Sequence, residues 1–269
     1  KMKFMIKEEI NRIKNLMLVN EENEMGQYMD STYLKTSEQA GIGEEETEVI
    51  VFNTIKDAIE HNMKLVMLRP EYVEVARNLI DSEGANVLVG TVIDFPYGNG
   101  SVTDKVQEAK QAVNNGADEL DFVIDYRAYL RGNVEKVSRE IKEGSEIGLK
   151  NGKTVKWILE TAALTEDQIG ELTSIIRDVI IDNFGEGEAA NVFVKTSTGF
   201  FTPEGGGPGG ATEEAVSIMT NNAGPLKVKA SGGIYSQDDL KKMVGAGASR
   251  IGTSAAKEIM LGQKTEKDY

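Results

Sequence analysis

Two spacings of hydrophobic residues alternate along the chain: short β-rich runs, and longer segments whose apolar positions recur at helical spacing. The short runs predict strands at residues 27–30, 64–68, 86–93, 119–125, 154–160, 191–195, 226–230 and 250–252. The longer segments predict helices at 48–61, 71–83, 103–115, 134–149, 166–184, 212–222 and 236–244. A leading helix is expected before the first strand, from apolar residues at helical spacing: Met5, Ile6, Ile10, Ile13, Leu16 and Met17.

The order of these elements predicts the fold class. Strands that alternate with helices pair in parallel, because each helix carries the chain back to the same end of the sheet. Eight predicted strands favour an α/β fold of the (β/α)8 TIM barrel type, with an extra N-terminal helix, over an open doubly wound sheet. The length of 269 residues is close to the roughly 250 of one such barrel. We therefore expect a single domain over residues 1–269, with a leading helix and linker at 1–26 and a C-terminal helix end and tail at 256–269.

Charge and composition narrow the class of partner. The formal net charge of −14 argues against a nucleic-acid binder, which needs a basic face, but allows a small anionic substrate held by a few cations and amide groups. The chain has no cysteine, so thiolate metal sites and cysteine nucleophiles are excluded. No apolar run approaches the ~18 residues of a membrane helix. We expect a soluble, cytoplasmic protein that binds neither nucleic acid nor membrane.

Two lysines lie at the ends of neighbouring predicted strands, where a barrel places its catalytic groups. Lys195 ends the sixth strand and Lys229 lies near the end of the seventh, and adjacent strands are only ~4.8 Å apart. A nearby like charge and burial both lower the pKa of a lysine, and the free amine can then attack a carbonyl to form an iminium. Asp121 on the fourth strand could pair with Lys229 and relay protons. A purely structural ion pair is the alternative, which stays open above all for Lys156 on the fifth strand.

Small residues follow the last two predicted strands, where barrels commonly bind phosphate. Gly232-Gly233 come after the seventh strand and Gly252-Thr253-Ser254 after the eighth, so their backbone N–H groups can face an anion. A glycine-rich stretch at 205–210 follows the sixth strand, either as a tolerated surface insertion or as a mobile flap over the active face. The single histidine, His61, precedes the second strand, which excludes a Ser-His-Asp triad at that face.

Two motifs surround the strand-end lysines: Val194-Lys195-Thr196-Ser197-Thr198-Gly199 and, downstream, Lys229-Ala230-Ser231-Gly232-Gly233. They resemble motifs of the class I deoxyribose-phosphate aldolase family. Residues 29–35 resemble the opening segment of that family, and residues 116–121 and 126–128 resemble its fourth-strand region. The resemblance runs in order from about Met29 to the residues after Ser254.

The resemblance implies reversible cleavage of 2-deoxy-D-ribose 5-phosphate to acetaldehyde and D-glyceraldehyde 3-phosphate, without a metal or organic cofactor. Lys195 matches the Schiff-base lysine, Lys229 the second lysine that tunes it, and Asp121 the acid/base aspartate. A phosphorylated sugar is then the small-molecule partner, and deoxyribonucleotide catabolism the expected role. The expected substrate-binding residues are Asp30, Thr32, Lys156, Thr198, Gly199, Gly232, Gly233, Gly252 and Ser254, with a tail contact from Tyr269.

Four positions depart from the family pattern. Ser31, Met67, Asp125 and Ala255 stand where a histidine, a cysteine, an uncharged residue and a serine are common in the family. Neither the lysine pair nor Asp121 is affected. Two other functions stay open: a catalytically weak or inactive aldolase-like barrel that acts as an interaction protein, and a Schiff-base aldolase for another sugar phosphate. A homodimer is expected from the frequency of such assemblies.

Overall fold

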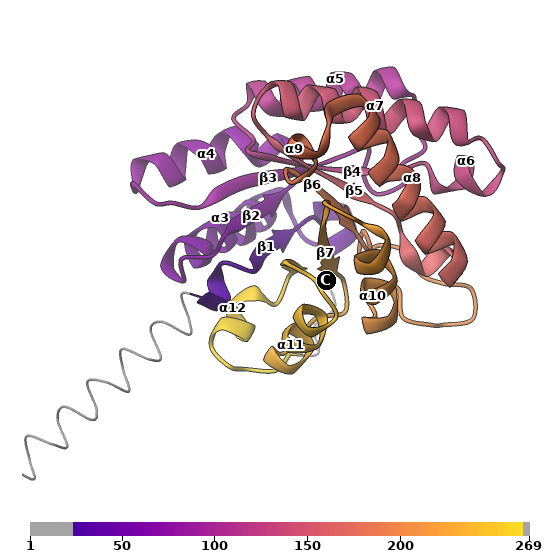
Figure 1. The fold of residues 1–269 in the computed structure, drawn as a ribbon. Coiled ribbons are helices and arrows are strands. Elements are labelled where there is room, and N and C mark those ends of the chain that lie inside the picture. Colours follow the sequence, from indigo (N-terminus) through magenta and orange to yellow (C-terminus); the bar gives the residue numbers. More distant parts are fainter. Residues whose placement is uncertain (1–23, 266–269) are drawn as a thin grey trace, which may run out of the picture.

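The strands of this protein close into a cylinder. The computed structural model describes residues 24–265, and across them eight parallel strands form a closed barrel in the order β1 to β8 (Figure 1). The predicted TIM-barrel class is therefore confirmed. The strands are β1 (Met29–Tyr33), β2 (Leu65–Leu68), β3 (Leu88–Ile93), β4 (Glu119–Val123), β5 (Thr154–Ile158), β6 (Val192–Lys195), β7 (Lys227–Ser231) and β8 (Arg250–Thr253).

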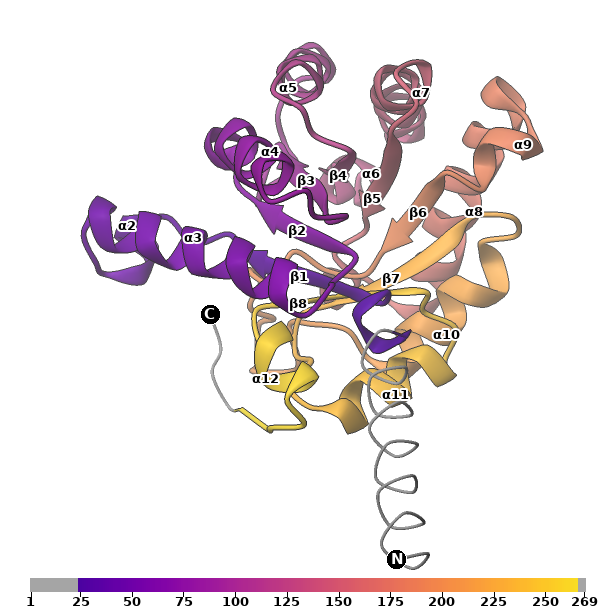
Figure 2. The ribbon, with the colours of Figure 1, turned by 90° about the vertical axis from the view of Figure 1, so that its left-hand side faces the viewer.

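Helices surround the barrel as an outer layer (Figure 2). Local sequence sets where they begin: Thr165 and Gln168 form a capping box at the start of α8, and Ser101 caps α5. The helices are α2 (Ser37–Ala40), α3 (Glu44–Glu60), α4 (Val73–Ser82), α5 (Val102–Asn114), α6 (Tyr126–Leu130), α7 (Val134–Lys150), α8 (Glu166–Phe184), α9 (Glu186–Ala189), α10 (Glu213–Asn222), α11 (Gln237–Gly245) and α12 (Ala256–Met260), with 3-10 turns η1 (Pro70–Tyr72) and η2 (Thr161–Ala163).

The contact of α7 with β4 and β5 shows how the outer layer holds the strands in place. Phe122 and Trp157 stack with their ring centroids 4.7 Å apart, and the Trp157 indole N–H donates to Ser145 Oγ at 2.9 Å. Gly144 lies against both rings, where a Cβ would come within 3.0 Å of each. Because a close-packed interior transmits small shifts, this contact fixes the two strands that carry charged side chains into the barrel.

Each of the eight predicted strands differs from the observed bounds by one to three residues, and for three of them the local reason is clear. β1 begins at Met29, after a turn that the Tyr28 N–H closes onto an upstream carbonyl, so Asp30 lies inside the strand. β4 ends before Asp125, whose carboxylate caps α6 by accepting from the Ala128 N–H at 2.9 Å. β5 ends before Glu160, where the backbone enters the left-handed region with φ 60°.

Some predictions lie outside the described residues. These are the leading helix and linker expected at 1–26, of which only residues 24–26 are described, and the tail contact from Tyr269. The short helices α2, α6 and α9 have no counterpart in the prediction. Within residues 24–265, no helix combines the length and the hydrophobicity that crossing a membrane requires.

Candidate active site

The register of the strands places charged residues side by side inside the barrel. Asp121 lies opposite Lys156, and Lys229 lies between Lys195 and Arg250. Side chains alternate between the two faces of a strand, so partners in register share a face. All five residues are buried. The two strand-end lysines therefore lie side by side, as predicted, and Arg250 on β8 lies next to Lys229.

Asp121 is at the centre of these contacts. Its Oδ2 accepts from the Nζ atoms of Lys195 and Lys229, both at 2.9 Å, and its Oδ1 accepts from Lys156 Nζ at 2.6 Å. Burial by itself raises the pKa of a carboxyl group, but the three lysines outweigh it and hold the pKa of Asp121 well below its usual range. Asp121 is therefore an ionised acceptor at neutral pH that aligns the Lys195 ammonium.

Further ion pairs support this centre. Asp30 Oδ2 lies 2.6 Å from Lys229 Nζ, and Glu119 Oε2 lies 2.5 Å from Lys156 Nζ. Arg250 bridges the two carboxylates, contacting both Asp30 and Glu119. Buried charges are costly unless they are paired. Here four cations face three carboxylates, so each charge has a partner and the lysines are held in fixed positions.

The Lys195 side chain combines burial with a position beside another lysine. Only 2% of the residue is exposed. Burial lowers the pKa of its ammonium group, Asp121 opposes that effect, and Lys229 adds to the lowering, which brings the pKa to about 8. An amine with this pKa is unprotonated in part of the molecules at neutral pH. Lys195 can therefore act as a nucleophile where an ordinary lysine cannot.

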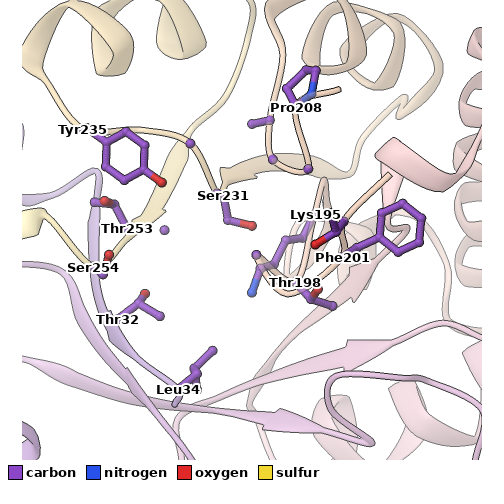
Figure 3. A pocket seen from close by; sticks show the side chains of 18 of the residues that line it. Thr32, Leu34, Lys195, Thr198, Phe201, Pro208, Ser231, Tyr235, Thr253 and Ser254 are labelled. Atoms are coloured by element: carbon purple, nitrogen blue, oxygen red, sulfur yellow. The ribbon is translucent and has the colours of Figure 1, made fainter. Parts of the chain in front are cut away.

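A cavity of about 420 Å³ opens beside Lys195, at the C-terminal ends of the strands. Figure 3 shows the Lys195 side chain reaching into it. Hydroxyl groups of Ser231, Thr253 and Ser254 come from β7, β8 and the turn after β8, and Tyr235 closes the same side (Figure 3). This volume and mixed lining suit a small polar ligand.

Most of the predicted site residues line this cavity, and four do not. Those on its wall are Lys195, Thr32, Thr198, Gly199, Gly232, Gly233, Gly252 and Ser254. Asp121, Lys229, Asp30 and Lys156 are completely buried and contact one another around Lys195. For Asp30 and Lys156 this place differs from the predicted contact with substrate, because their charged groups are engaged in ion pairs.

Closely packed glycine turns form one side of the cavity. Gly232 and Gly233 have φ of 81° and 73°, a region that favours glycine. Gly210 approaches so closely that a Cβ there would lie 2.3 Å from the Gly232 carbonyl, and the Ala211 N–H donates to that carbonyl at 3.0 Å. The glycine-rich stretch 205–210 is thus anchored at the cavity and lines part of it. Its movement as a flap stays a prediction.

Three buried charged residues near the site have no predicted role. Glu119 and Arg250 belong to the ion-pair network, and Glu160 accepts a hydrogen bond from Thr198 Oγ1 at 2.5 Å. A sequence signal exists for two of them: Glu119 alternates with Asp121, and Arg250 with Gly252, so each shares the inward face of its strand.

The four departures from the family pattern lie away from the cavity wall. Asp125 caps α6 and pairs with Lys136, which accounts for a charge at that position. Ser31, Met67 and Ala255 are buried. None of these four side chains therefore changes the surface that a ligand in the cavity would touch.

The fold and the cavity define a class: a TIM-barrel enzyme whose active face is built around buried lysines. Residues 25–262 match the model of the DeoC/LacD family aldolases, and the chain belongs to that family. The predicted resemblance to deoxyribose-phosphate aldolases is confirmed, and the protein is an aldolase, a carbon–carbon lyase.

Named relatives agree with this membership. The chain is 37% identical over 243 residues to the deoxyribose-phosphate aldolase of Staphylococcus haemolyticus (strain JCSC1435), covering 90% of this chain and 98% of that protein. It is 38% identical over 244 residues to deoxyribose-phosphate aldolase 1 of Staphylococcus aureus (strain MRSA252), with the same coverage. The structure of the tetrameric deoxyribose phosphate aldolase from Aeropyrum pernix superposes with a TM-score of 0.71 at 29% identity, covering 89% of this chain and 91% of that one.

Proposed function

We propose that this aldolase reversibly cleaves 2-deoxy-D-ribose 5-phosphate to acetaldehyde and D-glyceraldehyde 3-phosphate through a Schiff base on Lys195. One observation carries the proposal: the Lys195 amine reaches the cavity, with its pKa lowered to about 8 and with Asp121 2.9 Å away. The names of the relatives point to the same substrate.

The reaction begins at the aldehyde of the open-chain sugar. The unprotonated Lys195 amine attacks C1, and loss of water gives an iminium, which accepts electrons readily. Asp121, acting through water and Lys229, takes the C3 hydroxyl proton as the C2–C3 bond breaks. The bonding electrons move into the iminium to form an enamine, and D-glyceraldehyde 3-phosphate leaves. Protonation of the enamine at C2 and hydrolysis then release acetaldehyde and free Lys195.

The remaining predicted residues divide between binding and support. The backbone N–H groups of Gly232 and Gly233, with the Ser254 hydroxyl, form a neutral cradle suited to the phosphate. Asp30 and Lys156 hold Lys229 and Asp121 in place rather than touching the sugar. A homodimer and a cytoplasmic location stay predictions, and light scattering of the purified protein tests the first.

The proposal is tested by measuring acetaldehyde released from 2-deoxyribose 5-phosphate, coupled to NADH oxidation by alcohol dehydrogenase. Ribose 5-phosphate and fructose 1,6-bisphosphate serve as comparison substrates, and a separate coupled assay measures the triose phosphate that their cleavage would release. We expect the deoxy sugar to give the highest kcat/KM and Lys195→Ala to abolish the signal. Faster cleavage of another sugar phosphate would indicate an aldolase specific for that sugar. No cleavage of any of them would favour an inactive barrel that acts as an interaction protein.

A further inference from the structure

Glu160 is a buried carboxylate that the proposed reaction does not use. It follows the end of β5, only 2% of the residue is exposed, and it is not part of the cavity wall. Its backbone adopts φ 60° and ψ 62°, which is uncommon for a residue with a side chain. Strained backbone and buried charge at one residue beside an active site call for a physical reason.

Both carboxylate oxygens of Glu160 accept hydrogen bonds from one residue of the cavity wall, Thr198. Oε2 accepts from Thr198 Oγ1 at 2.5 Å, and Oε1 accepts from the Thr198 backbone N–H at 3.2 Å. Thr198 Oγ1 in turn accepts from the Phe200 N–H at 3.0 Å. Glu160 therefore fixes both the backbone and the hydroxyl of the residue that lies three positions after Lys195.

These contacts decide which way the Thr198 hydroxyl can bond. An ionised carboxylate accepts hydrogen bonds only, so the single hydroxyl proton of Thr198 is donated to Glu160. Toward the cavity, Thr198 Oγ1 can then only accept. A sugar hydroxyl can donate to it, whereas a phosphate dianion has no proton to offer and gains nothing there.

The charge of Glu160 depends on pH in the range where the enzyme works. Burial raises the pKa of Glu160 to about 7, against the opposing effect of its hydrogen bonds from Thr198. The charged or titratable groups that face it are Lys195 on β6 and Arg127 and Tyr126 on α6. Below about pH 7 the neutral acid can donate to Thr198 Oγ1, which turns the hydroxyl proton toward the cavity.

We infer that Glu160 is a positioning residue that makes the Thr198 hydroxyl an acceptor for a hydroxyl group of the sugar and thereby keeps the phosphate at the glycine turns. The inference rests on the proposed function, since it assigns a subsite for that substrate. A merely structural role would require only that the turn after β6 be held, which an amide side chain can also do.

The variant Glu160→Gln separates these two roles. The glutamine oxygen can still accept from the Thr198 N–H, which leaves its NH₂ group to donate to Thr198 Oγ1. The hydroxyl proton of Thr198 then points into the cavity. The side chain at position 160 changes little in size and still accepts from the Thr198 backbone N–H. Glu108→Gln is the matched control. Glu108 is half-buried, also has a raised pKa, and accepts a hydrogen bond from the Asp94 N–H at 2.9 Å. It does not line the Lys195 cavity.

Two aldehydes are compared at pH 8.5, where Glu160 is ionised. The first is 2-deoxyribose 5-phosphate in the cleavage assay, and the second is acetaldehyde, which has no hydroxyl group, trapped on Lys195 with cyanoborohydride. We expect Glu160→Gln to raise KM for the sugar phosphate at least tenfold and to leave the rate of acetaldehyde trapping within twofold. Glu108→Gln should change neither.

Two further readouts tie the effect to the Thr198 hydroxyl. Thr198→Val should raise KM to a similar extent, Thr198→Ser should retain the wild-type value, and Glu160→Gln combined with Thr198→Val should add little further, because the two residues act through one contact. In the wild type, the ratio of KM for the sugar phosphate to the rate of acetaldehyde trapping should change with pH. This ratio should rise as the pH falls from 8.5 to 6. In Glu160→Gln that ratio should be flat.

An unchanged KM in Glu160→Gln would overturn the inference, as would an equal loss of acetaldehyde trapping, which would mean that Glu160 acts on Lys195 or on the fold. A wild-type protein that forms no adduct with either aldehyde would overturn the proposed function itself, and the inference with it. The acetaldehyde arm therefore tells the two failures apart.

Discussion

Lys195 experiences two opposing influences inside the barrel. Burial and the neighbouring Lys229 favour the neutral amine, whereas Asp121 at 2.9 Å favours the ammonium. The result is a pKa of about 8, so that a Schiff base can form while the ammonium form still orders the site. Loss of the Lys195 proton also removes one of the three cations that hold the pKa of Asp121 low. Asp121 thus becomes a better base once the amine has become a nucleophile.

The variant Lys229→Met tests this electrostatic coupling. Without the second lysine, the pKa of Lys195 should rise, because a cation beside it is lost while Asp121 remains. Trapping of acetaldehyde as a function of pH should shift its midpoint upward by about one unit, with a rate at pH 7 roughly tenfold lower. Lys227→Met is the control, since Lys227 lies on the same strand but is exposed. An unchanged midpoint in Lys229→Met would contradict the coupling.

At the scale of elements, the network of Arg250, Asp30 and Glu119 ties β8, β1 and β4 together across the barrel. Arg250→Met should lower the free energy of unfolding by about 3–5 kcal/mol, because it removes a buried cation that pairs with both of the buried carboxylates Asp30 and Glu119. Urea unfolding followed by circular dichroism measures this. The exposed Arg139→Met removes an i,i+4 pair on α7 and should leave the curve unchanged. Equal stability of the two variants would show that the network holds little of the fold.

The glycine turns make a second prediction at this scale. Gly210→Ala places a Cβ 2.3 Å from the Gly232 carbonyl, so one of the two turns must move. Because Gly232 and Gly233 form the proposed phosphate cradle, we expect KM for the sugar phosphate to rise at least tenfold with little change in acetaldehyde trapping. Gly245→Ala in α11 meets no neighbour and is the control. A normal KM in Gly210→Ala would place the phosphate elsewhere.

The sequence predicts the elements whose signals are local. Helix α8 begins and ends where expected because a capping box at Thr165 starts it and a glycine follows its last residue. Lys195 and Lys229 are predictable because lysines at strand ends in a barrel share a small space. The partners of Arg250, which are Asp30 and Glu119, are not predictable, since they depend on how the strands are arranged around the barrel. The turn at Glu160 is missed for another reason, because left-handed backbone carries no signal in a glutamate.

At the scale of the whole molecule, the surface and the interior differ in charge. The chain carries a net charge of −14, yet the barrel interior holds four cations and three carboxylates. The barrel interior therefore does not share the acidic balance of the whole protein, and binding of an anionic sugar depends on short-range contacts in the cavity rather than on long-range attraction.

This interior also predicts the dependence of stability on pH. The pKa values of Asp30 and Asp121 are lowered by the surrounding cations despite burial, so both stabilise the fold above their unfolded pKa of about 3.9 and lose that effect as the pH falls. We expect the free energy of unfolding to drop steeply below about pH 4. Glu160 has the opposite sign: its raised pKa makes stability fall as the pH rises from 4.5 to about 7, and Glu160→Gln should remove that slope. Urea titrations between pH 3 and 8 measure both, and a stability independent of pH would contradict them.

The central claim is the Schiff base on Lys195, and borohydride reduction in the presence of 2-deoxyribose 5-phosphate tests it most directly. Intact mass shows whether an adduct forms, and peptide mapping shows where. We expect one adduct, on Lys195, that is absent from a folded Lys195→Ala variant. An adduct confined to another lysine, or none in folded wild-type protein at saturating sugar, would contradict this account.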